Sequence, residues 1–188
     1  MRQSETDMAE QIFKATEHLM AREGLHNLST HKIAKEAKIS AGTIYLYFKS
    51  KEELLSQFAW LVFSLFDKAL KKDFDETEDY FKQYQKMWRN IWTFLQTDPD
   101  VIVNMQQYQS LPGFLEICTK MEHESLWTRF CQKAQQAEVL CNLPVGILFA
   151  LSLESAIKLA VKQFYFKETF SEDILSMTIE RTWRSIQK

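Results

Sequence analysis

Five lysines lie within residues 28–51 and are opposed by one acid, Glu36. They are Lys32, Lys35, Lys38, Lys49 and Lys51. The stretch therefore nets +4, whereas the remaining residues hold 18 basic and 24 acidic side chains and net −6. Ammonium groups gathered on one part of an otherwise acidic chain are suited to bind phosphates. The whole-chain charge of −2 excludes a uniformly basic, histone-like coat.

Hydroxyls and small side chains accompany these lysines. In the second half of the stretch they are Ala41, Gly42, Thr43, Tyr45 and Tyr47. Small residues allow close approach to base edges, and hydroxyls bond phosphates or bases. The chemistry indicated is therefore contact with a nucleic-acid duplex. The alternative is a helical hairpin with a solvated lysine face, because short lysine runs are common on wet surfaces.

Two short helices joined by a tight turn are expected to position these groups. The first begins near Ser29 or Thr30, and Ser40 caps the second, which ends at Tyr47. Ser50 and Glu53 fit a capping box that opens a long helix to about residue 72. The expected core beneath the motif consists of Ile33, Ala34, Ala37, Ile39, Ile44 and Phe48.

The rest of the chain also reads as helical. Only 4 glycines and 3 prolines occur in 188 residues, and 46% of residues are hydrophobic, which favours an all-α protein. We expect about nine helices and no strand. One helix precedes the motif, over about residues 9–23, and six follow it, over about 51–72, 81–95, 98–108, 113–138, 142–167 and from 171 onward.

The motif resembles the DNA-binding signature of the TetR/AcrR family of transcriptional regulators. The resemblance covers about residues 9–55 and centres on Gly42-Thr43-x-Tyr45-x-Tyr47-Phe48-x-Ser50-Lys51-Glu52. It implies a DNA-binding helix-turn-helix domain at residues 1–50 and an effector-binding and dimerisation domain at residues 51–188. It also implies a homodimer that binds a palindromic operator in double-stranded DNA, since a twofold dimer reads two half-sites.

The resemblance assigns roles by position. Thr30, Tyr45, Tyr47 and Lys51 would bind phosphates, the last with a helix N-terminus behind it. His31 would contact a base or a phosphate, and Ala41, Gly42 and Thr43 would face the major groove. The expected DNA-binding set is Thr30, His31, Lys32, Ala41, Gly42, Thr43, Tyr45, Tyr47 and Lys51.

A small hydrophobic effector is also implied. Its candidate contacts are Trp88, Trp92, Met105, Tyr108, Trp127, Phe130 and Phe149, although such aromatic residues are more often ordinary core. The expected dimer interface lies on the C-terminal helices and includes Phe149, Ser152, Ala156, Leu175, Ile179 and Trp183. The alternative is that these residues form the core of a single protomer.

Other classes of function have little support. No glycine-rich phosphate loop, GxSxG or HExxH occurs, so neither an enzyme nor a cofactor or metal site is expected. Cys118, Cys131 and Cys141 match no zinc spacing, and we expect reduced thiols in a cytoplasmic protein. The apolar run 143–153 is too short to span a membrane. The expectation is thus a ligand-responsive regulator, most simply a repressor; the alternative is a helical small-molecule-binding or interaction module that does not bind DNA.

Overall fold

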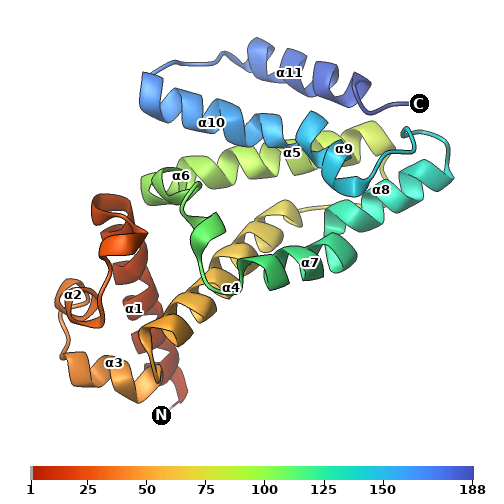
Figure 1. Ribbon diagram of the computed structural model, residues 1–188. Helices are drawn as coiled ribbons and strands as arrows, with labels where there is room; N and C mark the ends of the chain where they lie inside the picture. Colours follow the sequence, from red (N-terminus) through yellow and green to blue (C-terminus); the bar gives the residue numbers. More distant parts are fainter. Residues whose placement is uncertain (1) are drawn as a thin grey trace. The chain divides into compact units, whose positions relative to one another are not determined.

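The computed structural model describes residues 2–188, and the side chains of all of these except 2–6, 121 and 122 (Figure 1). Within that range the chain is all-α, as predicted, and its one β-type pairing is an isolated bridge between Leu140 and Gln187. The elements are α1 (Arg2–Glu23), η1 (Leu25–Asn27), α2 (Thr30–Glu36), α3 (Ala41–Tyr47), α4 (Lys51–Leu70), α5 (Tyr80–Thr97), α6 (Pro99–Asn104), η2 (Tyr108–Ser110), α7 (Phe114–Glu124), α8 (Leu126–Gln136), α9 (Val145–Leu151), α10 (Glu154–Phe166) and α11 (Glu172–Arg184). No helix of the described residues is long and apolar enough to cross a bilayer.

The helices group into two compact units. The first consists of Met1–Val62 and Asp100–Phe114, and the second of Phe63–Pro99 and Leu115–Lys188. Helix α4 is shared, because its first twelve residues, 51–62, belong to the first unit and its remainder to the second. Because it also includes Asp100–Phe114, the first unit is discontinuous in sequence.

In the first unit, α2 packs against α1 and α3 around a buried apolar core. The segment 100–114 is fixed to α1 by polar side chains. The Asn104 amide donates to the Glu17 carbonyl at 2.9 Å, and the Tyr108 hydroxyl donates to the Glu17 carboxylate at 2.8 Å. The Gln107 side chain accepts from the Leu25 N–H at 2.6 Å. These bonds join parts of the chain more than 80 residues apart.

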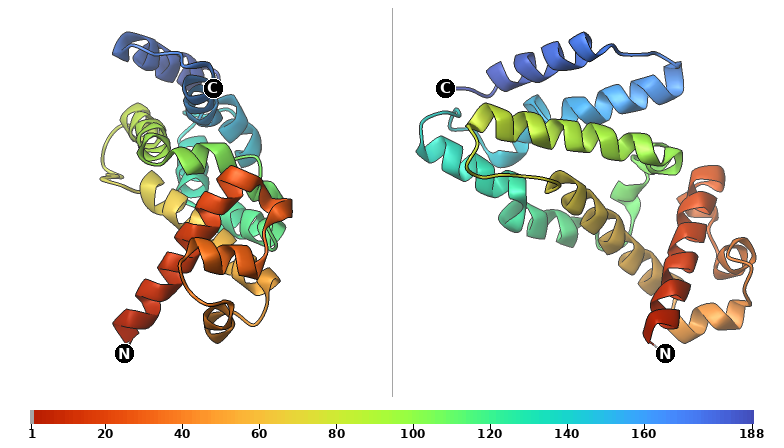
Figure 2. Two further views of the ribbon diagram at one scale, coloured as in Figure 1. Left: turned by 90° about the vertical axis from the view of Figure 1, so that its left-hand side faces the viewer. Right: turned by 180° about the vertical axis from the view of Figure 1, so that it is seen from behind.

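In the second unit, α5 is the central helix and packs against α10 and α11 (Figures 1 and 2). Its buried face carries Tyr84, Trp88, Ile91 and Leu95 at helical spacing. The Trp88 indole N–H donates to the Ser155 hydroxyl at 2.8 Å, so the largest buried ring of α5 keeps a polar partner.

Two expected long helices are each divided. Ser125 separates α7 from α8 and caps α8, accepting from the Thr128 N–H at 3.1 Å. Ser152 separates α9 from α10, with φ −133° and ψ −86°, and its hydroxyl donates to the Leu148 carbonyl at 2.5 Å. Serine hydroxyls compete for backbone groups and thereby favour helix ends. These breaks account for the eleven α-helices in residues 2–188, where nine helices were expected.

Candidate nucleic-acid interface

Helices α2 and α3 form the predicted helix-turn-helix. Ser29 caps α2 by accepting from the Lys32 N–H, and Ser40 caps α3 by accepting from the Thr43 N–H at 3.0 Å. The turn between them passes through Lys38, whose φ of 57° lies in the left-handed region. The Ile33 and Ile44 side chains are fully buried between the helices. Both predicted caps are confirmed, and they fix where the exposed face of α3 begins.

Hydroxyls from both helices meet on the exposed face. The Tyr45 side chain of α3 is 54% exposed, and its hydroxyl lies 3.2 Å from the Thr30 hydroxyl of α2. The Thr43 hydroxyl lies 2.8 Å from that of Ser40. Tyr47 is half-buried. The hydroxyls of Thr30, Thr43 and Tyr45 are thus each held by a hydrogen bond to another hydroxyl of the motif.

Gly42 lies on this face, and neither its backbone conformation nor any neighbouring atom of the chain requires a glycine there. Its φ is not positive, and a Cβ built there would meet only the Ser40 hydroxyl, at an ordinary 3.6 Å. Glycine inside a helix costs about 0.5–1 kcal/mol relative to alanine. Gly42 therefore leaves an open space on the exposed face of α3 that would admit the close approach of an outside partner.

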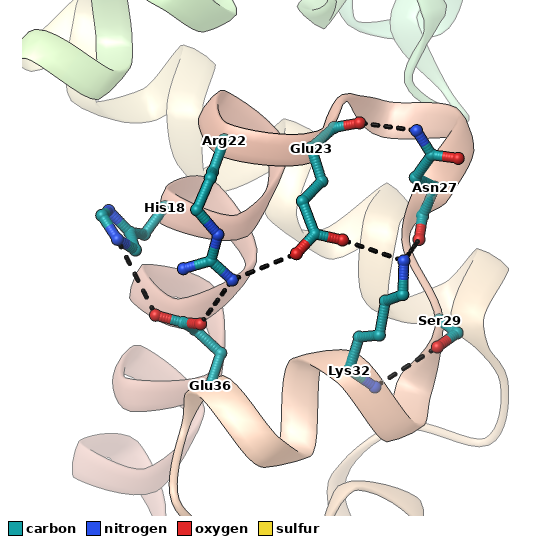
Figure 3. A network of polar contacts seen from close by, with 7 residues as sticks. All are labelled: His18, Arg22, Glu23, Asn27, Ser29, Lys32 and Glu36. Atoms are coloured by element: carbon teal, nitrogen blue, oxygen red, sulfur yellow. Dashed lines mark hydrogen bonds and ion pairs between the residues drawn. The ribbon is translucent and has the colours of Figure 1, made fainter.

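Not all of the lysines in the formal charge count are free of partners within the chain. The Lys32 ammonium donates to the Glu23 carboxylate at 2.8 Å and to the Asn27 carbonyl at 3.0 Å (Figure 3). The Lys51 ammonium donates to the Leu28 carbonyl at 3.1 Å. Among the described side chains, Lys35, Lys38 and Lys49 are exposed and have no ion-pair partner. Lys32 is therefore directed toward α1, and the cations free to attract phosphates are fewer than the sequence suggested.

A charged network connects α1 to α2 (Figure 3). Arg22 bonds Glu36 at 2.9 Å and Glu23 at 3.2 Å. His18 lies 2.9 Å from Asp100 and 3.8 Å from Glu36. The hydrogen bond from Lys32, followed by that from Arg22, holds the pKa of the Glu23 carboxyl below its ordinary value. The network therefore holds α2 against the C-terminal half of α1.

The predicted DNA-binding residues are brought together on α2, α3 and the start of α4. His31, Gly42 and Tyr45 are exposed, whereas Ala41, Thr43, Tyr47 and Lys51 are half-buried and Thr30 is buried. The sequence reading missed Leu46, which is 82% exposed on the same helix. Its only sequence signal is its place within α3, between two tyrosines.

A second site is a cavity of about 370 Å³ in the second unit. Its lining is mostly apolar and consists of Phe63, Phe66, Leu70, Cys118, Ser125, Trp127, Thr128, Val145, Gly146 and Phe149. Of the predicted effector contacts, Trp127 and Phe149 therefore lie in the lining. Phe130 is buried against Trp127, with ring centroids 5.5 Å apart.

The remaining predicted effector contacts lie elsewhere. Trp88 and Trp92 stack on each other at 5.9 Å and are not part of the lining. Met105 and Tyr108 belong to the first unit. The spacing of the aromatic residues identified apolar helix faces, but it did not distinguish a cavity wall from packed core.

The predicted dimer residues are mostly enclosed by their own protomer. Ser152, Ala156, Leu175, Ile179 and Trp183 are buried within the chain, and Phe149 lines the cavity. The same region exposes other apolar side chains that the sequence reading did not select. These are Leu143, Ile147, Leu151, Tyr165, Phe166, Ile174 and Met177. No group of three or more metal-ligating side chains occurs among the described residues.

Comparison with known proteins matches both parts of the chain. The family described as "Bacterial regulatory proteins, tetR family" matches residues 12–58, and the "Tetracyclin repressor-like, C-terminal domain" matches residues 79–187. An HTH-type transcriptional regulator of Haemophilus influenzae is 54% identical over 188 residues, covering 100% of both chains.

Solved structures show the same likeness. A TetR-family regulator from Haemophilus influenzae superposes with a TM-score of 0.92 at 54% identity, covering 99% of this chain and 100% of that one. The Bacillus subtilis regulator FadR in complex with stearoyl-CoA gives a TM-score of 0.71 at 19% identity, covering 93% and 95%. The latter likeness concerns the fold alone.

Proposed function

Because this chain belongs to the TetR family of transcriptional regulators, we propose that it is a repressor that binds a palindromic operator as a homodimer and is released by a small hydrophobic effector. It would act in the cytoplasm on bacterial DNA. Residues 1–50, together with Lys51 at the start of α4, would supply the DNA contacts, and the rest of the chain would supply the effector site and the dimer surface.

The face of α3 is the observation that carries the DNA-binding part of the proposal. It combines an exposed glycine that its own chain does not require, paired hydroxyls from Thr30 and Tyr45, and nearby unpaired lysines. Small groups admit base edges, hydroxyls bond phosphates, and lysines attract the duplex.

A gel shift with the full chain and the DNA upstream of its own gene tests this part. We expect binding that weakens steeply with salt. Tyr47→Phe and Lys51→Ala should each weaken binding by about tenfold through loss of a phosphate contact. Lys72→Ala removes an exposed lysine of the second unit and serves as the matched control. Since Lys51 also bonds the Leu28 carbonyl, circular dichroism must show that Lys51→Ala remains folded.

No binding at low salt, or indifference to both substitutions, would remove the DNA mechanism. The chain would then be better described as a helical small-molecule-binding module. The cavity would remain its functional feature in that case.

The cavity supports the effector part of the proposal. A volume of about 370 Å³ falls within the range of small-molecule sites, and the mostly apolar lining suits a hydrophobic ligand. Phe63, Phe66 and Leu70 of the lining lie on α4, whose earlier residues Leu54 and Phe58 are buried in the first unit. A ligand that prefers one position of α4 would therefore shift the arrangement of the DNA-binding helices.

Stearoyl-CoA is the first probe, because a regulator of this fold binds it. Gly146 lines the cavity, and a Cβ built there would meet nothing within 4 Å. Gly146→Leu should fill the space, abolish release by the probe and preserve DNA binding, while Gly146→Ala should retain release. Shorter acyl-CoAs and free fatty acids then define the ligand. Release that survives Gly146→Leu would place the effector elsewhere.

Exposed apolar side chains of α9 and α11 support the dimer part. Ile147 and Leu151 share one face of α9, and Ile174 and Met177 share one face of α11. We propose these side chains as the interface, in place of the buried residues of the same helices. Ile174→Asp with Met177→Asp should yield monomers in sedimentation and weaken operator binding. Leu115→Asp, at another exposed leucine, is the control and should leave the dimer intact.

A further inference from the structure

Leu46 is an apolar side chain on a helix face that is otherwise polar or small. It is 82% exposed, whereas the flanking Ile44 and Phe48 are buried. Single exposed leucines are common on protein surfaces and need no explanation by themselves. The position of this one does, because α3 is the helix that carries the proposed contacts to DNA.

Leu46 shares its face of α3 with two residues of the preceding turn. It follows Gly42 by four positions and Thr43 by three, and residues at these separations are neighbours on a helix surface. Long side chains in helices lean toward the preceding turn. A Cβ built at Gly42 would meet only the Ser40 hydroxyl, at 3.6 Å, so the Leu46 side chain does not fill the gap beside Gly42 and stays free to meet a partner on this face.

The chemistry of a leucine restricts what it can read in the major groove. It offers no donor or acceptor, and the only apolar group that a base presents there is the C5-methyl of thymine. Apolar contact with any other base edge would leave polar groups desolvated without a hydrogen bond. A leucine at this position thus favours thymine and disfavours the other bases.

We propose that Leu46 is a specificity-determining residue that selects a thymine in each half of the operator through its C5-methyl group. This inference rests on the proposed function, in that α3 must enter the major groove. Ala41 also carries an apolar side chain, but it is half-buried and lies five residues away, on a different face of α3.

The experiment begins with selection of bound sites from random duplex DNA by the full chain. The affinity for the selected site is then measured by fluorescence anisotropy while each thymidine is replaced in turn by deoxyuridine. This exchange removes only the C5-methyl. We expect one position per half-site at which the exchange weakens binding by about fourfold, as burial of one methyl group predicts.

Leu46→Ala then links that methyl to this side chain. The variant should bind the selected site about tenfold more weakly and should lose its sensitivity to the thymine methyl. Leu46→Met keeps a flexible apolar side chain and should retain the sensitivity. Leu115→Ala removes a leucine that is 79% exposed in the second unit, and it should change neither quantity.

The possible failures are distinct. If selection enriches no DNA, the proposed function itself fails. If a selected site binds tightly but no deoxyuridine exchange alters affinity, the thymine inference is overturned while the DNA-binding function stands. The inference is equally overturned if Leu46→Ala remains as sensitive to the thymine methyl as the unaltered protein.

Discussion

The hydroxyls of Thr30 and Tyr45 lie 3.2 Å apart and join the two helices of the helix-turn-helix. Thr30 is 8% exposed, so its hydroxyl has little access to water when this partner is lost. The same tyrosine hydroxyl is expected to bond a phosphate. One atom therefore serves the packing of α2 on α3 and the proposed contact with DNA.

Tyr45→Phe should lower the free energy of unfolding by about 1 kcal/mol, because one hydrogen bond at a nearly buried hydroxyl is lost. Denaturant unfolding of Tyr45→Phe, Thr30→Val and the double variant measures the coupling of the pair. We expect it to be about 0.5–1 kcal/mol. Strict additivity of the two single effects would show that the hydroxyls do not interact in solution.

Gly42→Ala should separate stability from binding. The free energy of unfolding should rise by about 0.5–1 kcal/mol, because a Cβ fits there and alanine favours the helix. DNA affinity should fall by about tenfold, because the methyl group blocks close approach of a base edge. Denaturant unfolding and fluorescence anisotropy measure the two quantities. Gly146→Ala is the control at a second open helical glycine, and unchanged affinity in Gly42→Ala would refute the close approach.

The Glu23–Lys32 ion pair predicts a pH dependence of stability. In the folded chain the Glu23 carboxylate accepts hydrogen bonds from Lys32 and from Arg22. These bonds, that from Lys32 first, lower the pKa of Glu23. The stabilisation is therefore complete above the unfolded pKa of about 4.3 and is lost as pH falls through the lower, folded pKa. Lys32→Met removes the first donor. The urea concentration at the midpoint of unfolding should therefore fall less between pH 7 and pH 3 for this variant than for the unaltered protein. Lys35→Met is the control; an equal fall in Lys32→Met and the unaltered protein would contradict the assignment.

The three thiols provide natural probes of the cavity. Burial raises the pKa of the Cys131 thiol, so iodoacetamide should label Cys118 and Cys141 first and Cys131 only after unfolding. Cys118 lines the cavity and Cys141 does not. Stearoyl-CoA should therefore slow labelling of Cys118 alone, as followed by mass spectrometry. Equal protection of Cys118 and Cys141 would indicate a general change in the protein instead of occupancy of the cavity.

Local features of the fold could be predicted because neighbours in sequence decide them. Ser29 and Ser40 cap their helices as expected, and Ser171 caps the helix expected from residue 171 onward, since each hydroxyl needs only an N–H three residues away. At Ser50 only one of the two hydrogen bonds of the predicted capping box forms. Its hydroxyl accepts from the Glu53 N–H at 3.1 Å, but the Glu53 carboxylate accepts from the Lys49 N–H at 2.7 Å instead of closing the box on Ser50.

Features that depend on distant parts of the chain could not be read in this way. The formal charge of residues 28–51 gave no sign that Lys32 is paired with Glu23 on another helix. Periodicity placed Leu175, Ile179 and Trp183 on one face of α11 but did not show that this face packs on its own protomer and not on a partner. Nor does any local pattern pair Gln107 with the backbone of Leu25.

The discontinuity of the first unit has a practical consequence for anyone who divides this chain. An excised fragment that ends with α4 would lose the segment Asp100–Phe114, whose Asn104 and Tyr108 side chains both bond Glu17 on α1. Chimaeras that exchange effector pockets between related regulators face the same constraint. In such a chimaera the first unit must include the segment Asp100–Phe114 from the same regulator as α1. Otherwise the segment and α1 come from different proteins, and their contact surfaces did not evolve together.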